Sequence, residues 1–151
     1  MTMRTQRGFT LIELMMVVMV AAVMAGIAVP SFREFMAAQR VKNTAFDFAA
    51  ALLLARSEAV KRNTSISVAQ TGANWQGWTV AAGGTTLVTR EAPTQVTITP
   101  NDVAFTSVPF QGNGRVPNTM RFQFSAADTQ TVRCVTIGVS GVPNTTTTSC
   151  S

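Results

Sequence analysis

The residues that most often carry catalysis and metal binding are scarce in this 151-residue sequence. It contains no histidine, which removes the commonest general base and the commonest metal ligand. Asp102 and Asp128 lie far apart in turn-like segments, where carboxylates usually cap or hydrogen-bond the backbone. Because no nucleophile stands beside a base, we expect no enzymatic activity, no metal site and no cofactor.

The two cysteines, Cys134 and Cys150, do not form a plausible zinc site without histidine. Both follow a segment that we expect to enter a membrane, so we interpret them as a disulfide formed in an oxidising compartment. On the chain-entropy model, closing a loop of this length stabilises the fold by about 3 kcal/mol.

A single carboxylate, Glu13, interrupts the apolar run of residues 7–32, which reads "RGFTLIELMMVVMVAAVMAGIAVPSF". Residues 9–29 form a helix long enough to cross a bilayer core of about 30 Å, and Arg4 and Arg7 precede it. Pro30 removes a helical hydrogen bond, so a kink is expected there.

Four explanations of residues 4–30 compete. A cleaved secretory signal peptide fits the basic start but not Glu13, nor the helical pattern that continues beyond Pro30. A plain membrane anchor leaves Glu13 unexplained. A buried core helix needs a larger domain around it than this chain offers. The fourth explanation is a resemblance, described below.

The second half of the helix, residues 30–63, is amphipathic. We expect Val41, Ala45, Phe48, Leu52, Ala55 and Ala59 to form a core stripe, widened on one side by Phe46, Ala49, Leu53 and Val60. Small residues at positions 55, 57 and 59 suit close packing. Glu58 can pair with Arg62 one turn later.

The sequence pattern of residues 64–151 is that of short strands and turns. Strands are expected in residues 64–70, in a hairpin over 75–90 around Gly83-Gly84, and in 94–100, 103–108, 119–125 and 131–140. Residues 111–118 are expected to be a loop, and the polar tail to be loose unless Cys150 ties it back. The predicted fold class is α+β: one long N-terminal helix packed on a C-terminal antiparallel β-sheet domain.

The opening stretch resembles the class III leader and N-terminal helix of type IV pilins and type II secretion pseudopilins. Gly8 matches the last leader position, Phe9 the first mature position, Glu13 the fifth mature position, and Pro30 the usual kink. The resemblance implies a leader of residues 1–8, a transmembrane and filament-core segment of 9–29, an amphipathic periplasmic half of 30–63, and a periplasmic β-rich domain of 64–151.

The same resemblance implies a sequence of events and a set of partners. A prepilin peptidase cuts after Gly8 and methylates the new amine of Phe9. The subunit waits in the bacterial inner membrane, N-terminus cytoplasmic, and is then incorporated into a filament of major and minor pilins or pseudopilins by an inner-membrane assembly platform. Glu13 would meet the Phe9 amine of a neighbour, since an unpaired carboxylate is costly in lipid; the alternative is that Glu13 only snorkels to the interface.

Within these proteins, "LLLARSEAVKRNTSISV" resembles the GspH/FimT group, which includes FimU-like minor pilins, and "NWQGWTV" and "FQGNGRV" do so more loosely. The resemblance implies a minor pilin that primes assembly or caps the tip of a type IV pilus. A pseudopilin of a type II secretion system is the alternative.

DNA uptake is a further alternative, because some relatives in this group bind DNA through a basic C-terminal region. Here residues 142–151 contain no lysine or arginine, although the chain as a whole carries a net charge of +5. Arg115 and Arg133 are candidate phosphate contacts, and Trp75 and Trp78 could stack on bases. Because tryptophans near a hairpin more often pack in a core, we favour assembly over DNA binding.

Overall fold

The computed structural model of the protein describes residues 8–150. The chain divides into two units, residues 1–34 and residues 35–151, which are described separately. The expected leader, residues 1–8, lies outside the described part except for Gly8.

The first unit contains the start of helix α1, whose bounds are Leu11–Arg62. The most apolar 18-residue window of this helix has a mean hydropathy of 2.5, and none of the window is buried. The helix is therefore long and apolar enough to cross a membrane, and this stretch is not the core of the folded domain. Pro30 lies inside α1, and the kink expected there stays a prediction.

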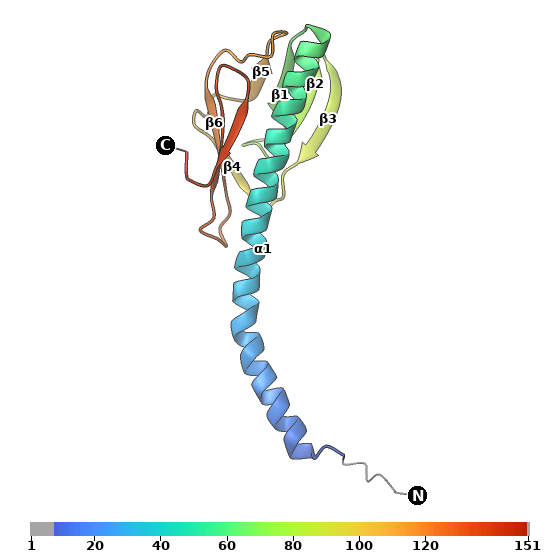
Figure 1. The fold of residues 1–151 in the computed structure, drawn as a ribbon, viewed down its shortest axis with the longest axis vertical. Coiled ribbons are helices and arrows are strands. Elements are labelled where there is room, and N and C mark those ends of the chain that lie inside the picture. The colour runs from blue at the N-terminus through green and yellow to red at the C-terminus, as the bar shows by residue number, and fades with distance from the viewer. Residues whose placement is uncertain (1–7, 151) are drawn as a thin grey trace, which may run out of the picture. The chain divides into compact units, whose positions relative to one another are not determined.

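In the second unit, the rest of α1 is followed by eight strands (Figure 1). The strands are β1 (Ile66–Gln70), β2 (Gly77–Ala82), β3 (Thr85–Glu91), β4 (Thr97–Pro100), β5 (Ser107–Phe110), β6 (Met120–Ser125), β7 (Arg133–Ile137) and β8 (Pro143–Thr146). They form two four-stranded sheets in the orders β3-β2-β1-β5 and β4-β6-β7-β8, and every pairing is antiparallel. The predicted fold class is confirmed, with two sheets in place of one.

One hydrophobic core joins the helix to both sheets, and Phe48 is at its centre. The Phe48 ring lies 5.6 Å from Trp75, 5.2 Å from Trp78 and 4.9 Å from Phe122, measured between ring centroids. Edge-to-face contacts of this kind add to the stability that area burial gives. Both tryptophans are about 99% buried, so their predicted packing role is confirmed.

The core stripe of α1 was predicted correctly, but its width was not. The side chains expected at its centre, at positions 41, 45, 48, 52, 55 and 59, are all fully buried. Of the four residues expected to widen it, Ala49 packs partly buried against the core, but the expectation is wrong for Phe46, Leu53 and Val60, which are about half exposed. The stripe widens on its other flank instead, through Ala37, Thr44 and Ala51.

Local signals explain where α1 ends. Asn63 adopts a positive φ of 47°, Thr64 N donates to Ala59 O (3.2 Å), and Asn63 N donates to Val60 O (3.3 Å). These two bonds close a helix end in which asparagine takes the left-handed position. The predicted Glu58–Arg62 pair is present at 2.6 Å. Ser57 is exposed and donates to Leu54 O, so its predicted packing role is wrong.

The predicted strands are present, most of them with shorter bounds than expected, and two differences go beyond the bounds. The hairpin turn is Gly83-Gly84, and both glycines have positive φ, as a two-residue turn requires. The strand expected over 103–108 begins at Ser107, because Asp102 Oδ1 accepts a hydrogen bond from Ala104 N and holds a turn there. The C-terminal tail contains strand β8, which was not predicted because the tail is polar in composition.

The disulfide between Cys134 and Cys150 is present, as predicted. It links β7 to the end of the chain beyond β8, and Cys150 N also donates to the Gln123 side chain (3.1 Å). The polar tail is therefore fixed to the second sheet by strand pairing and by a covalent bond.

Candidate functional site: the assembly helix

The start of α1 brings together the residues that the sequence analysis marked for processing and assembly. Phe9 is 85% exposed, and Glu13 lies in the first turn of the helix. The Glu13 carboxylate accepts hydrogen bonds from Thr10 N (2.9 Å) and Thr10 Oγ1 (3.0 Å), and Glu13 N donates to Thr10 Oγ1 (3.3 Å).

This reciprocal arrangement is a capping box, in which the first residue and the fourth satisfy each other's backbone N–H groups. Sequence reasoning missed it, although the signal is present as Thr10-Leu11-Ile12-Glu13 ahead of an apolar run. Glu13 therefore has a local partner in the isolated chain. Any pairing with a neighbour's amine would have to add to, or replace, the contact with Thr10.

A second surface lies on α1 in the folded unit. Phe35, Phe46, Leu53 and Val60 are 56%, 58%, 49% and 53% exposed, and their spacings of eleven, seven and seven residues place them on one side of the helix. We call these four residues the outer stripe. Because the core face of α1 is covered by both sheets, the helix is apolar on two sides.

Two loops pack beside the outer stripe near the end of α1. Arg56 Nε donates to Gly114 O (3.3 Å), and a Cβ placed on Gly114 would lie 2.8 Å from Val60 Cγ2. A Cβ on Gly141 would lie 1.9 Å from Gly114 O, so this position requires glycine. The two loops are thus fixed against α1, and the nearby valines Val139 and Val142 remain 44% and 49% exposed.

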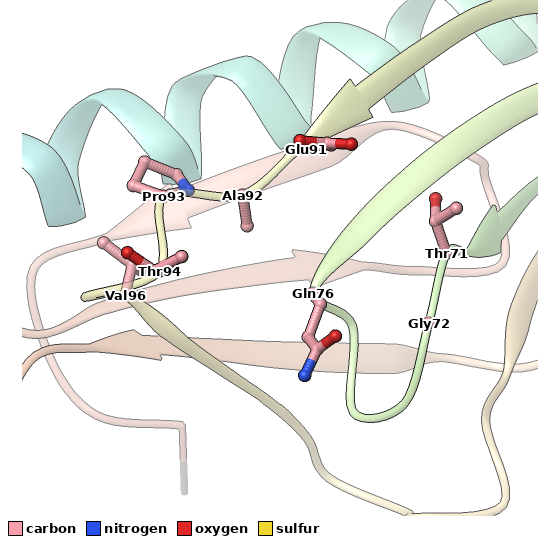
Figure 2. Close-up of a pocket in the computed structure, with 8 residues that line it drawn as sticks. All are labelled: Thr71, Gly72, Gln76, Glu91, Ala92, Pro93, Thr94 and Val96. Atoms are coloured by element: carbon pink, nitrogen blue, oxygen red, sulfur yellow. The ribbon is translucent and has the colours of Figure 1, made fainter.

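A groove in the described residues offers no comparable chemistry. It has a volume of about 590 Å³ and lies between the β1–β2 loop and the β3–β4 connection (Figure 2). It is lined by Thr71, Gly72, Gln76, Glu91, Ala92, Pro93, Thr94 and Val96. Glu91 is its only carboxylate, and no base or nucleophile stands beside it. Residues 8–150 also contain no group of three His, Cys, Asp or Glu side chains that could hold a metal ion.

Comparison with known protein families shows to which family this chain belongs. The sequence profile of the family described as "Type II transport protein GspH" matches residues 44–141, which is more than half of the chain. The chain belongs to the GspH family. The profile of the prokaryotic N-terminal methylation motif matches residues 3–29, the stretch that holds Gly8, Phe9 and Glu13.

Individual proteins also match this chain in sequence. Two fimbrial proteins of Pseudomonas aeruginosa are each 30% identical to this GspH-family chain over 99 residues, which is 66% of this chain. The match spans 63% of the length of those relatives, less than two thirds.

Solved structures agree on the fold. Two crystal structures of the type IV minor pilin FimU of Pseudomonas aeruginosa match with a TM-score of 0.62. Their sequences are 23% and 22% identical, and the matches cover 70% of this chain and 91% and 87% of theirs. At this level of identity the likeness establishes the shared fold.

The residues predicted as DNA contacts do not form a site with the tryptophans. Arg115 is exposed in the 111–118 loop, whereas Arg133 is half-buried and donates from Nη1 to Val132 O (2.9 Å). Trp75 and Trp78 are buried, and Trp75 Nε1 donates to Phe105 O (2.9 Å), so neither ring offers a face to a base.

Proposed function

We propose that this GspH-family protein is a minor pilin that enters a type IV pilus and helps to prime its assembly or cap its tip. The observation that carries the proposal is the apolar surface of α1. It begins in the exposed stretch within the methylation motif, where no residue of the apolar window is buried, and recurs on the folded unit as the outer stripe. A helix that is apolar outside its own core needs a partner, either lipid or other subunits.

The proposed maturation follows the motif. A prepilin peptidase would cut after Gly8 and methylate the amine of Phe9, while α1 anchors the subunit in the inner membrane with the β-rich domain in the periplasm. Cleavage would leave Phe9 with a positive amine four residues before Glu13. An assembly platform would then move the subunit from lipid into a bundle of such helices, where apolar side chains of neighbours replace lipid.

Glu13 has two proposed roles that differ in what they require. Capping of α1 needs a hydrogen-bond acceptor at this position, which glutamine also supplies. Pairing with the Phe9 amine of a neighbouring subunit needs a negative charge, because the attraction is between ions in a low-dielectric bundle. We propose that the charge carries assembly and that the capping box holds the carboxylate in place before assembly.

The test compares three variants of the full chain by membrane fractionation and by immunoblots of sheared filaments. Glu13→Gln should enter the membrane normally and be depleted from filaments, as should Glu13→Val. Thr10→Val, which removes the capping hydroxyl and keeps the charge, should be incorporated nearly as well as the wild type. Normal incorporation of Glu13→Gln would refute charge pairing, and absence of the wild-type chain from filaments would refute the pilus role.

The printed description of the matching family favours one alternative. It names a type II transport protein, so the same chain could serve as a pseudopilin in a type II secretion system. The fimbrial relatives and the likeness to FimU support the pilus instead. Deleting the chain separates the two proposals: loss of surface filaments supports the pilus, whereas intact filaments with failed export of a secreted enzyme support the pseudopilus.

A further inference from the structure

The two sheets together have four edge strands, and three of them are protected. The edges are β3 and β5 in one sheet and β4 and β8 in the other. Pro109, Pro100 and Pro143 lie in β5, β4 and β8, and each of these strands has four residues. Proline and short length are two of the ways, beside charged side chains and β-bulges, in which proteins stop an edge from pairing with another chain.

Strand β3 has neither proline nor a short length, and the one register shift in its pairing with β2, between Val80 and Ala81, lies before Thr89–Glu91. It runs for seven residues, Thr85–Glu91, and is the only edge strand without proline among residues 8–150. Leu87 and Val88 pack partly against the core, and the other five residues are exposed. The β-branched residues that fill most of this strand favour pairing.

The hydrogen bonds at the end of β3 show which backbone groups face outward. Ala92 N donates to the O atom of Gln76, the residue just before β2 (2.8 Å), and the register pairs Glu91 with Gly77 and Thr89 with Thr79. Along an antiparallel strand, successive residues face alternately toward and away from the partner. The N–H and C=O groups of Thr89 and Glu91 therefore face away from β2, toward the open edge.

We propose that β3 is a docking edge that accepts an extended, proline-free segment of a different pilin subunit as an added antiparallel strand. This inference rests on the proposed function, since it names how a neighbouring subunit contacts the folded domain. Main-chain hydrogen bonds to Thr89 and Glu91 would supply the attachment. Arg90 and Glu91 would favour a segment with an acidic residue opposite Arg90 and a basic one opposite Glu91.

A second copy of this chain fits the edge less well than a different subunit. Two β3 strands paired antiparallel would be related by a two-fold axis perpendicular to the strands. In Figure 1, β3 runs in the same lengthwise direction as the C-terminal half of α1, so the same axis would turn these halves of the two α1 helices in opposite directions. Subunits drawn from one membrane into one filament point the same way, which leaves a different pilin as the occupant.

Hydrogen exchange of the backbone amides tests the proposal directly. In the detergent-solubilised full chain, mass spectrometry should find the amides of Thr89 and Glu91 exchanging rapidly and that of Arg90 protected. In sheared filaments that contain the chain, the Thr89 and Glu91 amides should exchange at least about tenfold more slowly. Unchanged exchange in filaments that do contain the wild-type chain would overturn the inference and leave the pilus role intact.

Two variants at one position separate main-chain docking from side-chain docking. Thr89→Pro removes the outward N–H and spares the bonds to β2, so its incorporation should fall; Thr89→Val keeps the N–H and should be incorporated normally. Formation of the Cys134–Cys150 disulfide checks that each variant folds. Equal loss in both variants, or protected amides in a homodimer of the isolated chain, would overturn the proposal, and absence of the wild type from filaments would remove its basis.

Discussion

Phe46 and Phe48 are two residues apart on α1, and we predict that their alanine variants fail in opposite ways. Phe48 is fully buried among aromatic rings, so Phe48→Ala should lower the free energy of unfolding by about 3–5 kcal/mol. Phe46 belongs to the outer stripe and is 58% exposed. In the isolated chain, Phe46→Ala should therefore change stability by no more than about 0.5 kcal/mol.

The effect of Phe46→Ala should appear only on assembly. A phenylalanine side chain offers about 200 Å² of surface, so the 58% that is exposed leaves about 120 Å² for a neighbour to cover. At about 25 cal/mol per Å², full coverage contributes about 3 kcal/mol. Its loss would weaken the contact with a neighbouring subunit by about 100-fold.

Two assays on the full chain separate the variants. Urea unfolding of the detergent-solubilised protein, followed by near-ultraviolet circular dichroism of the buried tryptophans, measures stability. Immunoblots of sheared filaments measure incorporation, and Asp47→Ala, an exposed polar neighbour, is the matched control. If Phe46→Ala enters filaments as well as Asp47→Ala does, the outer stripe is not an assembly surface.

Three further predictions concern processing, the tail and nucleic acid. Gly8→Val should leave an uncut precursor, because a bulky side chain blocks the peptidase; intact mass of the membrane-extracted protein would show it, and a mature chain beginning at Phe9 would contradict it. Cys150→Ser with Cys134→Ala should lower stability by about 3 kcal/mol in urea unfolding, since the unfolded chain regains the freedom of the loop, and no loss would contradict this. The full chain in detergent should bind DNA weakly at an ionic strength of about 0.15 M in an anisotropy titration, because its sheets carry few cations; submicromolar binding abolished by Arg115→Ala would contradict it.

The parts of the fold that follow from local rules could be predicted from the sequence. Alternation placed Met120, Phe122 and Phe124 on one buried face of β6, and two adjacent glycines placed the hairpin turn. The end of α1 at Asn63 followed from the change in composition. Each of these features depends on a few neighbouring residues, so their number and spacing were enough.

The outer stripe could not be predicted in the same way. Periodicity gives the direction of the strongest apolar face of a helix, but both flanks of that face carried small or apolar side chains. Which flank the sheets cover depends on contacts between residues far apart in sequence. Phe46 and Leu53 fell on the uncovered flank, and Thr44 and Ala51 on the covered one.

The capping box at Glu13 was absent from the sequence-based predictions for a different reason. The interpretation of Glu13 as a lone charge in an apolar run did not include Thr10, three residues earlier, although this spacing is a local capping signal. Both roles fit one side chain, because the capping contact orders the first turn while the charge remains available to a partner. Among the variants of this site, Glu13→Gln is therefore more informative than Glu13→Val, which removes both roles together.

The apolar character of α1 on two sides explains how one helix can serve both folding and assembly. Its core face, centred on Phe48, contacts both sheets and stabilises the domain before any partner arrives. Each residue of the outer stripe is only about half exposed, so the isolated domain exposes less apolar surface than four fully exposed side chains would. Burial of that remaining surface is gained only when a neighbouring helix covers it. The energy available for assembly is thus separate from the energy that folds the domain, and substitutions on the two faces should act independently.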